Sequence, residues 1–487
     1  MKRAHLVILG AAAAIVVVGS VLHPVVASVP EPPAVVVEPV ESSRLVCPDP
    51  IASADVQSSV TAMVTPGLPG QKAGTGGAQI ATLPPKGTAV EKVSIPAAGA
   101  ARTLSTAGTP LPPVVASAKG SLAPGLVLDQ MTLGDQGKAR GLAAMECAAP
   151  GTDQWFVGGG SDVGRTSVVT LANPEESPAS VDVLLWGPMG PLPAPGGRGV
   201  FVPARGQVRL SLSALAPGVP QFVVHVDVQS GRVSAAVSDQ QVTGLIPRGV
   251  DWVPSAAAPS TTVVVVGIPA RVTPVQLSVL SPDHDATVKV RLLTPSGSFS
   301  PAGLTTVSLT AGQVEVVDLT KVLREQPSSV ELTSTVPIIA GAWYRLGEPT
   351  GVGEFAYAGS APALTGPAAV AGLPSGSTYR HRLYITNTAG DRDVTVMVTT
   401  INRQGKATKT KLKITRGSTQ VWTAKPPGEG SFSLVVTPPS GSGMIRVARV
   451  TSLPAASGTM ATGVPMSPVR SKVSVPEAQP NLAVANG

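Results

Sequence analysis

The sequence predicts an all-β protein made of tandem antiparallel β-sandwich units. Three observations predict this fold. Short segments with apolar–polar alternation, such as VDVLL and QVRLSL, are separated by turns rich in Gly, Pro, Asn and Ser. Helical periodicity is nearly absent. The same series of strands and turns recurs with a period of roughly 105 residues, which is typical of a seven-stranded, immunoglobulin-like sandwich.

The composition agrees with a folded, strand-rich chain. The 487 residues include 52 Gly and 49 Pro. That share is about a fifth, below the roughly 25–30% typical of disordered low-complexity chains. Aromatic residues are only 3% of the chain, so we expect cores of Val, Leu and Ile. The net charge of +7 is small for this length, and the basic residues form no recognisable nucleic-acid-binding module. We therefore expect no nucleic-acid partner.

The N-terminus predicts one hydrophobic helix over residues 1–28. Lys2 and Arg3 precede an uncharged apolar run at residues 6–22, which has the minimum length for a transmembrane helix. The small residues near Ala27 also fit a signal-peptide cleavage site. Two interpretations stay open: a single-pass membrane anchor with the C-terminal part outside, or a removed signal peptide and a secreted protein. Both place the remaining chain outside the cytoplasm.

Cys47 and Cys147 are the two cysteines of the chain. An even number of cysteines in an exported protein predicts a disulfide. Two free thiols are the alternative interpretation. A single pair so far apart in the sequence is no metal-binding signature.

The repeat divides the exported chain into units. Gly158, Gly267 and Gly372 align with one another, and the turns at Asn173 and Asn387 then fall into register. The predicted parts are a Pro-rich spacer at 29–42, a degenerate first unit with the disulfide at 43–154, units at 155–262, 263–367 and 368–465, and a disordered tail at 466–487. A β-propeller is disfavoured because its blades repeat at roughly 40–50 residues.

The stretch WFVGGGSDVGRT, beginning at Trp155, resembles a phosphate-binding loop. A P-loop also needs a Lys and a Ser or Thr at the start of a helix. Here an alternating strand follows, and the aligned units have GIPARV and GLPSGS instead. We therefore expect a tight turn and no bound cofactor.

We predict no catalytic or metal-binding residues. His225, His284 and His381 fall at different places in their units, and no G-x-S-x-G motif accompanies them. Carboxylates recur at the first hairpin turn of each unit: Glu175 and Glu176, Asp283 and Asp285, Asp391 and Asp393. Two side chains per turn are too few for calcium, which takes six or more oxygens. Solvated turn residues are expected, and a weak calcium site between units is the alternative.

Trp155, Trp252 and Phe355 recur near the unit junctions. They are either packed at unit interfaces or available to stack on glycan. The basic stretch at residues 406–416, KATKTKLKITR, alternates cations with Thr, Leu and Ile. It predicts a solvated strand face, or a docking face for anionic wall polymer or lipid headgroups.

The chain resembles a family of exported actinobacterial proteins known only as a domain of unknown function. The resemblance rests on the N-terminal apolar segment, LVCPDP, GLAAMECAAPGTDQWFVGGG and LANPEESPASVDVLLWGPMG. It extends over nearly the whole chain from about Ser43. It implies a place in the cell envelope, and it implies no activity, ligand or catalytic residue.

The preferred functional hypothesis is a non-enzymatic, extracytoplasmic cell-envelope protein that acts as a structural or protein-interaction scaffold. The alternative is a protein that binds wall polysaccharide. The least favoured alternative is a hydrolase with an unrecognised site. The expected partner is thus an envelope protein or a wall polysaccharide, and the sequence predicts no oligomeric state.

Overall fold

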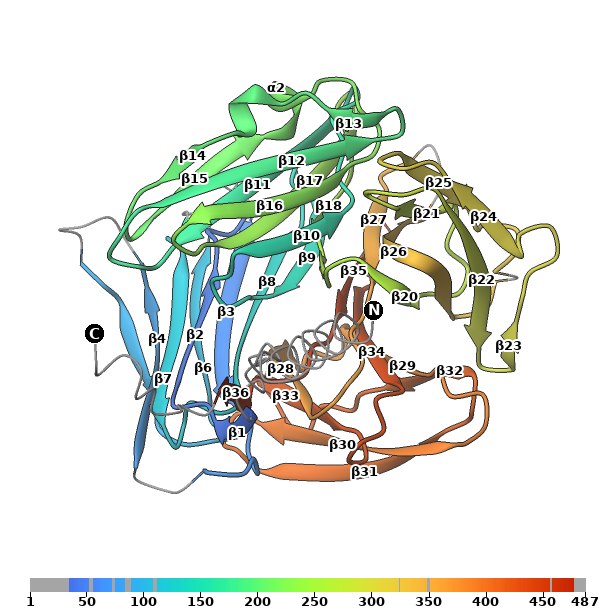
Figure 1. Cartoon of the computed structure of the whole chain (residues 1–487). Coiled ribbons are helices and arrows are strands. Elements are labelled where there is room, and N and C mark those ends of the chain that lie inside the picture. Colours follow the sequence, from blue (N-terminus) through green and yellow to red (C-terminus); the bar gives the residue numbers. More distant parts are fainter. Residues whose placement is uncertain are drawn as a thin grey trace, which may run out of the picture. The chain divides into compact units, whose positions relative to one another are not determined.

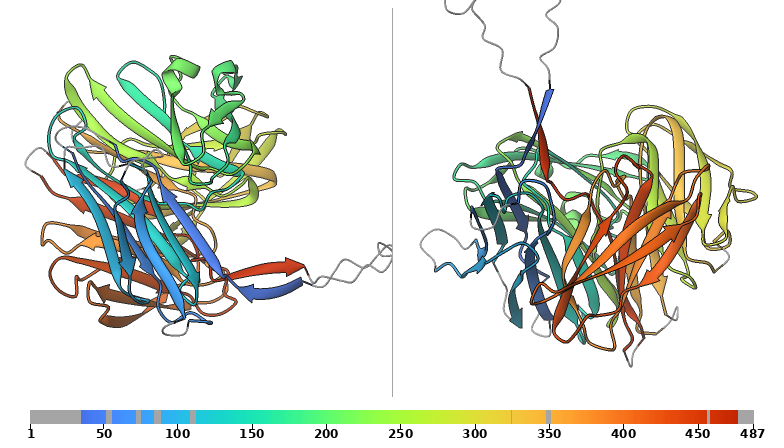
Figure 2. Two further views of the ribbon diagram at one scale, coloured as in Figure 1. Left: turned by 90° about the vertical axis from the view of Figure 1, so that its left-hand side faces the viewer. Right: turned by 90° about the horizontal axis from the view of Figure 1, so that it is seen from below.

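The structure is a computed structural model that describes residues 35–51, 56–71, 75–83, 89–107, 112–323, 325–347, 351–455 and 458–476. The chain forms two compact units. One contains Pro39–Ser471, and in the other β1 (Val35–Pro39) pairs with β36 (Lys472–Pro476), as Figure 2 shows. The apolar run at residues 6–22 lies outside the described residues, so the N-terminal helix stays a prediction. Within the described part, none of the helices is long and apolar enough to cross a membrane.

The larger unit consists of four successive β-sandwiches, coloured from blue to red in Figure 1. Sandwich 1 (residues 42–146) contains β2 (Ser42–Cys47), β3 (Val56–Val64), β4 (Gly76–Thr82), β5 (Lys92–Ile95), β6 (Ala101–Ala107), β7 (Val114–Gly120), β8 (Leu126–Gly134) and β9 (Gly141–Glu146). Sandwich 2 (residues 153–256) contains β10 (Asp153–Val157), β11 (Arg165–Asn173), β12 (Ala179–Gly187), β13 (Gly190–Leu192), η1 (Pro195–Gly197), β14 (Val200–Val202), β15 (Gly206–Ser211), α2 (Leu212–Leu215), β16 (Val223–Ser230), β17 (Ser234–Thr243), β18 (Ile246–Val253) and β19 (Ser255–Ala256).

The other two sandwiches complete the unit. Sandwich 3 (residues 260–359) contains β20 (Ser260–Ile268), β21 (Val275–Leu280), β22 (Ala286–Thr294), β23 (Gly297–Phe299), β24 (Thr306–Leu309), β25 (Val314–Asp318), β26 (Ser328–Leu346) and β27 (Glu354–Gly359). Sandwich 4 (residues 368–465) contains β28 (Ala368–Pro374), β29 (Arg380–Asn387), β30 (Val394–Asn402), β31 (Ala407–Ile414), β32 (Ser418–Thr423), β33 (Ser431–Thr437), β34 (Ile445–Leu453) and β35 (Met460–Pro465).

All four sandwiches share one strand order. Sheet A holds the first, sixth, third and fourth strands, as in β2-β7-β4-β5 and β28-β33-β30-β31. Sheet B holds the fifth, second, seventh and eighth strands, as in β6-β3-β8-β9 and β32-β29-β34-β35. In sandwich 3 the long strand β26 is both sixth and seventh, because its first half pairs with β22 and its second half with β21.

This order corrects the immunoglobulin-like part of the fold prediction. In the immunoglobulin fold the first, second, fifth and fourth strands share one sheet, and the sixth and seventh lie together in the other. Here the chain crosses between the sheets after the sixth strand, so the sixth and seventh strands lie in opposite sheets. Alternation and turn spacing are the same in both arrangements, and sequence patterns do not distinguish them.

Each sandwich has its own aliphatic core. In β12, for example, Val181, Val183 and Leu185 face inward and alternate with partly exposed residues. The recurrent turn asparagines are buried supports of the first hairpin. Asn173 donates through Nδ2 to the carbonyls of Ser177 and Val202. Asn387 makes the same pair of bonds, to Arg392 and Ile414, in sandwich 4.

The sandwiches pack in a cyclic order, with the outer face of each sheet A against sheet B of the next sandwich. Between sandwiches 2 and 3, Trp155, Val157 and Val223 pack against Leu280, Val314 and Ile339. Between sandwiches 3 and 4, Val264 and Val266 pack against Ala448 and Val450. Between sandwiches 4 and 1, Ala369 and Ala371 pack against Met63 and Val127. Sandwich 1 contacts sandwich 2 through an apolar cluster of Ala143, Ala236 and Trp252 and through polar bonds, among them Ser234 to the Val46 carbonyl. The contact between sandwiches 4 and 1 closes the series.

The eighth strands meet where the four sandwiches converge. Strands β9, β18, β27 and β35 each contact two of the others in the order β9–β18–β27–β35–β9. They are edge strands of their sheets. Their mutual contact covers edges that would otherwise offer unpaired backbone groups to other chains.

The three aligned glycines lie where sandwiches approach each other. A Cβ at Gly158 would come within 2.5 Å of the Tyr357 ring, and one at Gly372 would come within 2.2 Å of Oγ1 of Thr61. A Cβ at Gly267 would lie 3.0 Å from the Cβ of Ala448. Each glycine also has a positive φ, between 76° and 150°. The repeat therefore keeps glycine at these positions for close packing as well as for the turn.

The C-terminal segment differs from the expected disordered tail. Met466 is 2% exposed in the core of sandwich 4, and Pro468 forms a β-bridge with Ala368. Strand β36 then pairs with β1, which lies in the predicted spacer. Each segment gains its order from a partner far away in the sequence, which local patterns do not reveal. Residues 477–487 lie outside the described residues.

Candidate functional site

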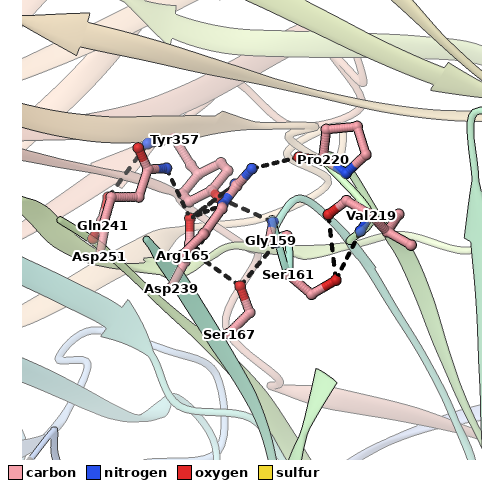
Figure 3. Close-up of polar contacts among 11 residues, drawn as sticks. Gly159, Ser161, Arg165, Ser167, Val219, Pro220, Asp239, Gln241, Asp251 and Tyr357 are labelled. Carbon is pink, nitrogen blue, oxygen red and sulfur yellow. Dashed lines mark hydrogen bonds and ion pairs between the residues drawn. The ribbon is translucent and has the colours of Figure 1, made fainter. Parts of the chain in front are cut away.

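The glycine loop that resembled a phosphate site, residues 158–164, joins β10 to β11 and is filled by groups of the protein itself (Figure 3). The Gly159 N–H donates to the phenol oxygen of Tyr357, and the Gly160 N–H donates to Oγ of Ser167. Ser161 Oγ donates to the Ala216 carbonyl and accepts from the Val219 N–H. The Gly158 and Ser161 N–H groups donate to the Phe222 and Val219 carbonyls, so the N–H groups of residues 158–161 are already bonded within the protein.

Next to this loop a buried ion pair joins β11 to β17. Nε and Nη2 of Arg165 donate to the carboxylate of Asp239 at 2.9–3.1 Å. Ser167 donates to Oδ1 of the same carboxylate at 2.7 Å, and Tyr357 of sandwich 3 donates to Oδ2 at 2.7 Å. Asp239 is fully buried. Burial, together with the Asp239 charge, raises the pKa of Tyr357 well above its usual value, so the phenol keeps its proton.

This network joins sandwiches 2 and 3 through hydrogen bonds. Ser167 contacts a carboxylate and an N–H group, whereas a serine nucleophile needs a general base such as histidine. Arg165 lies in sandwich 2 but also donates to the Tyr357 hydroxyl of sandwich 3. The guanidinium of Arg165 balances the charge of the Asp239 carboxylate, and both carboxylate oxygens accept hydrogen bonds. A buried carboxylate is tolerated under these conditions.

A second polar group lies among the converging eighth strands. The Asp251 carboxylate of β18 accepts from Thr462 Oγ1 of β35 and from the Tyr357 N–H of β27. The Glu354 carboxylate of β27 accepts from the Leu142 N–H of β9. Burial raises the pKa of Asp251 well above its usual range. Burial, and then the nearby Asp251 carboxyl, raise the pKa of Glu354 well above its usual range. Each bond crosses from one sandwich to another.

A third polar group holds sandwich 4 against sandwich 1. Asp129 Oδ2 accepts from the Ala371 N–H, and its Oδ1 lies 3.6 Å from Nη2 of Arg449. Glu146 accepts from the Ser467 N–H. Burial raises the pKa of Asp129 to about 6. Burial and then the Asp129 charge raise the pKa of Glu146 to about 8.

Glu146 also lines a cavity of about 190 Å³ at the convergence of the sandwiches. The other lining residues include Phe156, Ser255, Ser360 and Ser467. All four sandwiches or the segments that follow them contribute to this cavity. Glu146 is the ionisable residue in this lining, and its carboxyl already accepts from the Ser467 N–H at the contact between sandwiches 4 and 1.

The residues singled out from the sequence lie as follows. Cys47 and Cys147 form a disulfide in sandwich 1, at a sequence separation of 100, and both are buried in its core. Trp155 is 7% exposed and packs between sandwiches 2 and 3. Trp252 packs against Ala143 of sandwich 1, and Phe355 belongs to the core of sandwich 2. The structure therefore places the three aromatic rings at separate interfaces and not on one surface.

The basic stretch forms the exposed edge strand β31. Lys409, Lys411 and Lys413 share one exposed face, and Lys413 pairs with Asp393. Lysines on an edge strand also discourage pairing with another chain. The turn carboxylates of sandwich 2 pair with arginines, Glu175 with Arg44 and Arg232 and Glu176 with Arg205. Among the described residues, no cluster of three or more His, Cys, Asp or Glu side chains is arranged to hold a metal ion.

The histidines are in unrelated surroundings. His381 is buried between Thr451 and the Pro374 carbonyl, and burial lowers its pKa to about 4. His225 stacks on Trp155 and bonds to Asp153. The structure brings neither ring into the polar networks around Asp239 or Asp251.

The network residues Arg165, Asp239, Asp251, Glu354 and Tyr357 were not among the predicted site residues. A signal was nevertheless present in the sequence. Asp239 and Asp251 interrupt apolar strands at VSAAVSDQQ and GVDWVP, and charges inside such strands are rarely buried without a partner. Asp239 pairs with Arg165 of its own sandwich and accepts from Tyr357 of sandwich 3. Asp251 accepts from Thr462 of sandwich 4, and the sequence does not show any of these partners.

One comparison with known proteins gives a match. The model of a family of unknown function, DUF5719, matches residues 100–425, about two thirds of the chain. The chain belongs to this family. The match extends from β6 in sandwich 1 to the residues just after β32 in sandwich 4, so the DUF5719 region includes all of sandwiches 2 and 3. No curated protein matches the chain. The family assigns no activity, and the actinobacterial origin and envelope role stay predictions.

Proposed function

We propose that the chain is a non-enzymatic scaffold of the cell envelope that works outside the cytoplasm. The observation that carries this proposal is the role of the buried ionisable groups. Hydrogen bonds or ion pairs within and between sandwiches engage Arg165, Asp239, Asp251, Glu354 and Arg449. Such an assembly presents fixed outer sheets and loops to a partner, which suits a scaffold.

The disulfide supports a location outside the cytoplasm. Structural disulfides persist in oxidising compartments and are rare in the cytosol. The bond between Cys47 and Cys147 lies in the sandwich that directly follows the N-terminal spacer. The apolar run at residues 6–22 supplies the expected export signal or anchor.

The test is a topology and interaction experiment in the native host. The full chain carries a C-terminal tag, and intact cells with permeabilised walls are treated with protease. The cysteines are then alkylated under denaturing conditions, with and without reductant. We expect the tag to be cleaved, both cysteines to be unreactive without reductant, and crosslinking to capture envelope proteins. A protected tag together with two reactive thiols would refute the location. Capture of cytosolic proteins alone would refute the envelope scaffold.

Polysaccharide binding through Trp155, Trp252, Phe355 or residues 406–416 stays the alternative prediction. Burial of the three rings favours an interface role for them. Retention of the purified chain on anionic wall polymer, compared with a variant that has Lys409, Lys411 and Lys413 replaced by Gln, tests the remaining basic face. Equal retention of both proteins would remove residues 406–416 from the hypothesis.

A further inference from the structure

The outer face of sheet A in sandwich 2 carries a row of three aspartates. Asp182 of β12 lies directly opposite Asp227 of β16, which lies opposite Asp153 of β10. Like charges directly opposite one another on neighbouring strands destabilise a sheet. Neighbouring groups offset this repulsion in part. Arg198 pairs with Asp182, His225 bonds to Asp153, and Gln229 donates to Asp227.

Aromatic rings lie beside this row on the same face. Leu184, His225 and Trp155 form the next row, and Trp186 follows on β12. The rings of His225 and Trp155 stack at 3.9 Å with 7° between their planes, and Trp155 and Trp186 stack at 5.5 Å. Sandwich 3 covers Trp155, whereas Trp186 keeps part of its surface exposed. The stack therefore supports Trp186 from one side and leaves it available on the other.

Trp186 lines a groove of about 420 Å³. Leu184 also contributes to it, and its wall is the proline-rich segment 191–195 with Arg198. Asp182 accepts from the Gly199 N–H and from Arg198, so this wall is tied to the aspartate row. Small-ligand sites are mostly apolar, contain a few convergent polar groups and have volumes of roughly 300–1,000 Å³. The groove has a volume in this range and a mostly apolar lining that contains the charged residue Arg198. The polar groups of the aspartate row lie beside this lining.

We propose that this groove on sandwich 2, together with the aspartate row beside it on the same sheet face, binds a neutral oligosaccharide. The C–H face of a sugar ring packs on an indole, as apolar surface does on any aromatic ring. Its hydroxyls donate to carboxylates, which are acceptors only, in charge-assisted hydrogen bonds. An anionic polymer is disfavoured because Asp153 and Asp227 lie on the same sheet face as the groove, and Arg198 in its lining is already paired with Asp182. The proposal goes beyond the scaffold role and does not depend on it.

The test measures sugar binding by the full chain, purified in a detergent that contains no sugar. The probes are cellohexaose, mannohexaose and arabinohexaose, with a polygalacturonate hexamer as the anionic comparison. Isothermal titration gives the association constants, and saturation-transfer NMR identifies the sugar protons in contact. We expect at least one neutral hexamer to bind and the anionic hexamer not to bind.

The variants test the residues. W186A is expected to lower the association constant at least tenfold, D227N to lower it severalfold, and W186F to keep part of the binding. The matched control is W422A, because Trp422 of β32 is also a partly buried tryptophan but lies in sandwich 4. Thermal unfolding of each variant checks the fold, and W186F and D227N keep the test valid if W186A unfolds. Absence of binding to every neutral hexamer, or unchanged binding by W186A, would overturn the proposal.

Discussion

The phenol oxygen of Tyr357 in sandwich 3 lies 2.7 Å from Oδ2 of Asp239 in sandwich 2 and donates a hydrogen bond to it. The same oxygen accepts from the Gly159 N–H and from Arg165. One hydroxyl thus joins the glycine loop, the buried ion pair and the neighbouring sandwich. The loop that resembled a phosphate site is a joint between two sandwiches.

Removing this hydroxyl is expected to loosen the joint. Tyr357→Phe leaves the Gly159 N–H and one Asp239 lone pair unsatisfied in a buried site, which should cost about 1–3 kcal/mol of the free energy of unfolding. Urea unfolding at pH 7 measures this loss. Tyr379→Phe is the control, because the Tyr379 ring is partly exposed. Equal stability of Y357F and wild type would contradict the structural role of the hydroxyl.

The ion pair itself is tested by a double-mutant cycle. Arg165→Met or Asp239→Asn alone leaves one buried group without its partner, and each should cost about 3–5 kcal/mol. The double variant should cost clearly less than the sum, because no charge is left unpaired. Chemical denaturation of the four proteins gives the coupling energy. Strict additivity would show that the two side chains do not interact.

Gly372, at the contact between sandwiches 4 and 1, is expected to be essential for the packing of these two sandwiches. Ala at position 372 would adopt a positive φ and place its Cβ against Thr61, which should cost about 2–4 kcal/mol from backbone strain and overpacking together. Limited proteolysis should show sandwich 4 separating from sandwich 1. Gly390→Ala is the matched control, since no atom lies within 4 Å of its Cβ position. If G372A resists protease as wild type does, the close approach is not required.

The Glu146 carboxyl is expected to make stability depend on pH. Its pKa of about 8 in the folded protein lies above the ordinary value. Its stabilising contribution is therefore complete below the unfolded pKa and is lost as the pH rises through 8. Relative to Glu146→Gln, the unfolding free energy of wild type should fall between pH 6.5 and 8, by at most about 1.4 kcal/mol per pH unit.

Denaturant titrations at half-unit pH steps measure this slope. His381 has a lowered pKa, and its contribution is present above its unfolded value and lost as the pH falls through about 4, so it does not interfere in this window. Parallel stability curves for wild type and E146Q would show that Glu146 is not protonated in the folded state at neutral pH.

The disulfide is expected to be a large part of the stability of sandwich 1. Its sequence separation of 100 corresponds to roughly 4–5 kcal/mol in the chain-entropy model. The double variant Cys47→Ser, Cys147→Ser should lose about that amount. Calorimetry of the oxidised protein, the reduced protein and the double variant measures it. Similar unfolding of all three proteins would contradict the prediction.

The sequence by itself determined the class of the fold and the periodic positions. Alternation between apolar and polar residues produces strands with one buried face, and this alternation occurs in every unit, as in β12. The repeated turn residues could be recognised in the sequence because each copy needs the same local backbone. These residues are the glycines Gly158, Gly267 and Gly372 and the asparagines Asn173 and Asn387. The pairing of Cys47 with Cys147 followed from their being the only two cysteines.

Only the tertiary structure decided how the sheets are ordered and which sandwiches touch. Strand order depends on contacts between segments far apart, and alternation is the same whichever neighbour a strand has. Asp251 and Glu354 find partners across sandwich boundaries, and Asp239 is bonded both by Arg165 of its own sandwich and by Tyr357 of the next one. Their burial could therefore not be predicted from their own strands. The same holds for Trp155 and Trp186, because a neighbouring sandwich covers the first and leaves the second partly exposed.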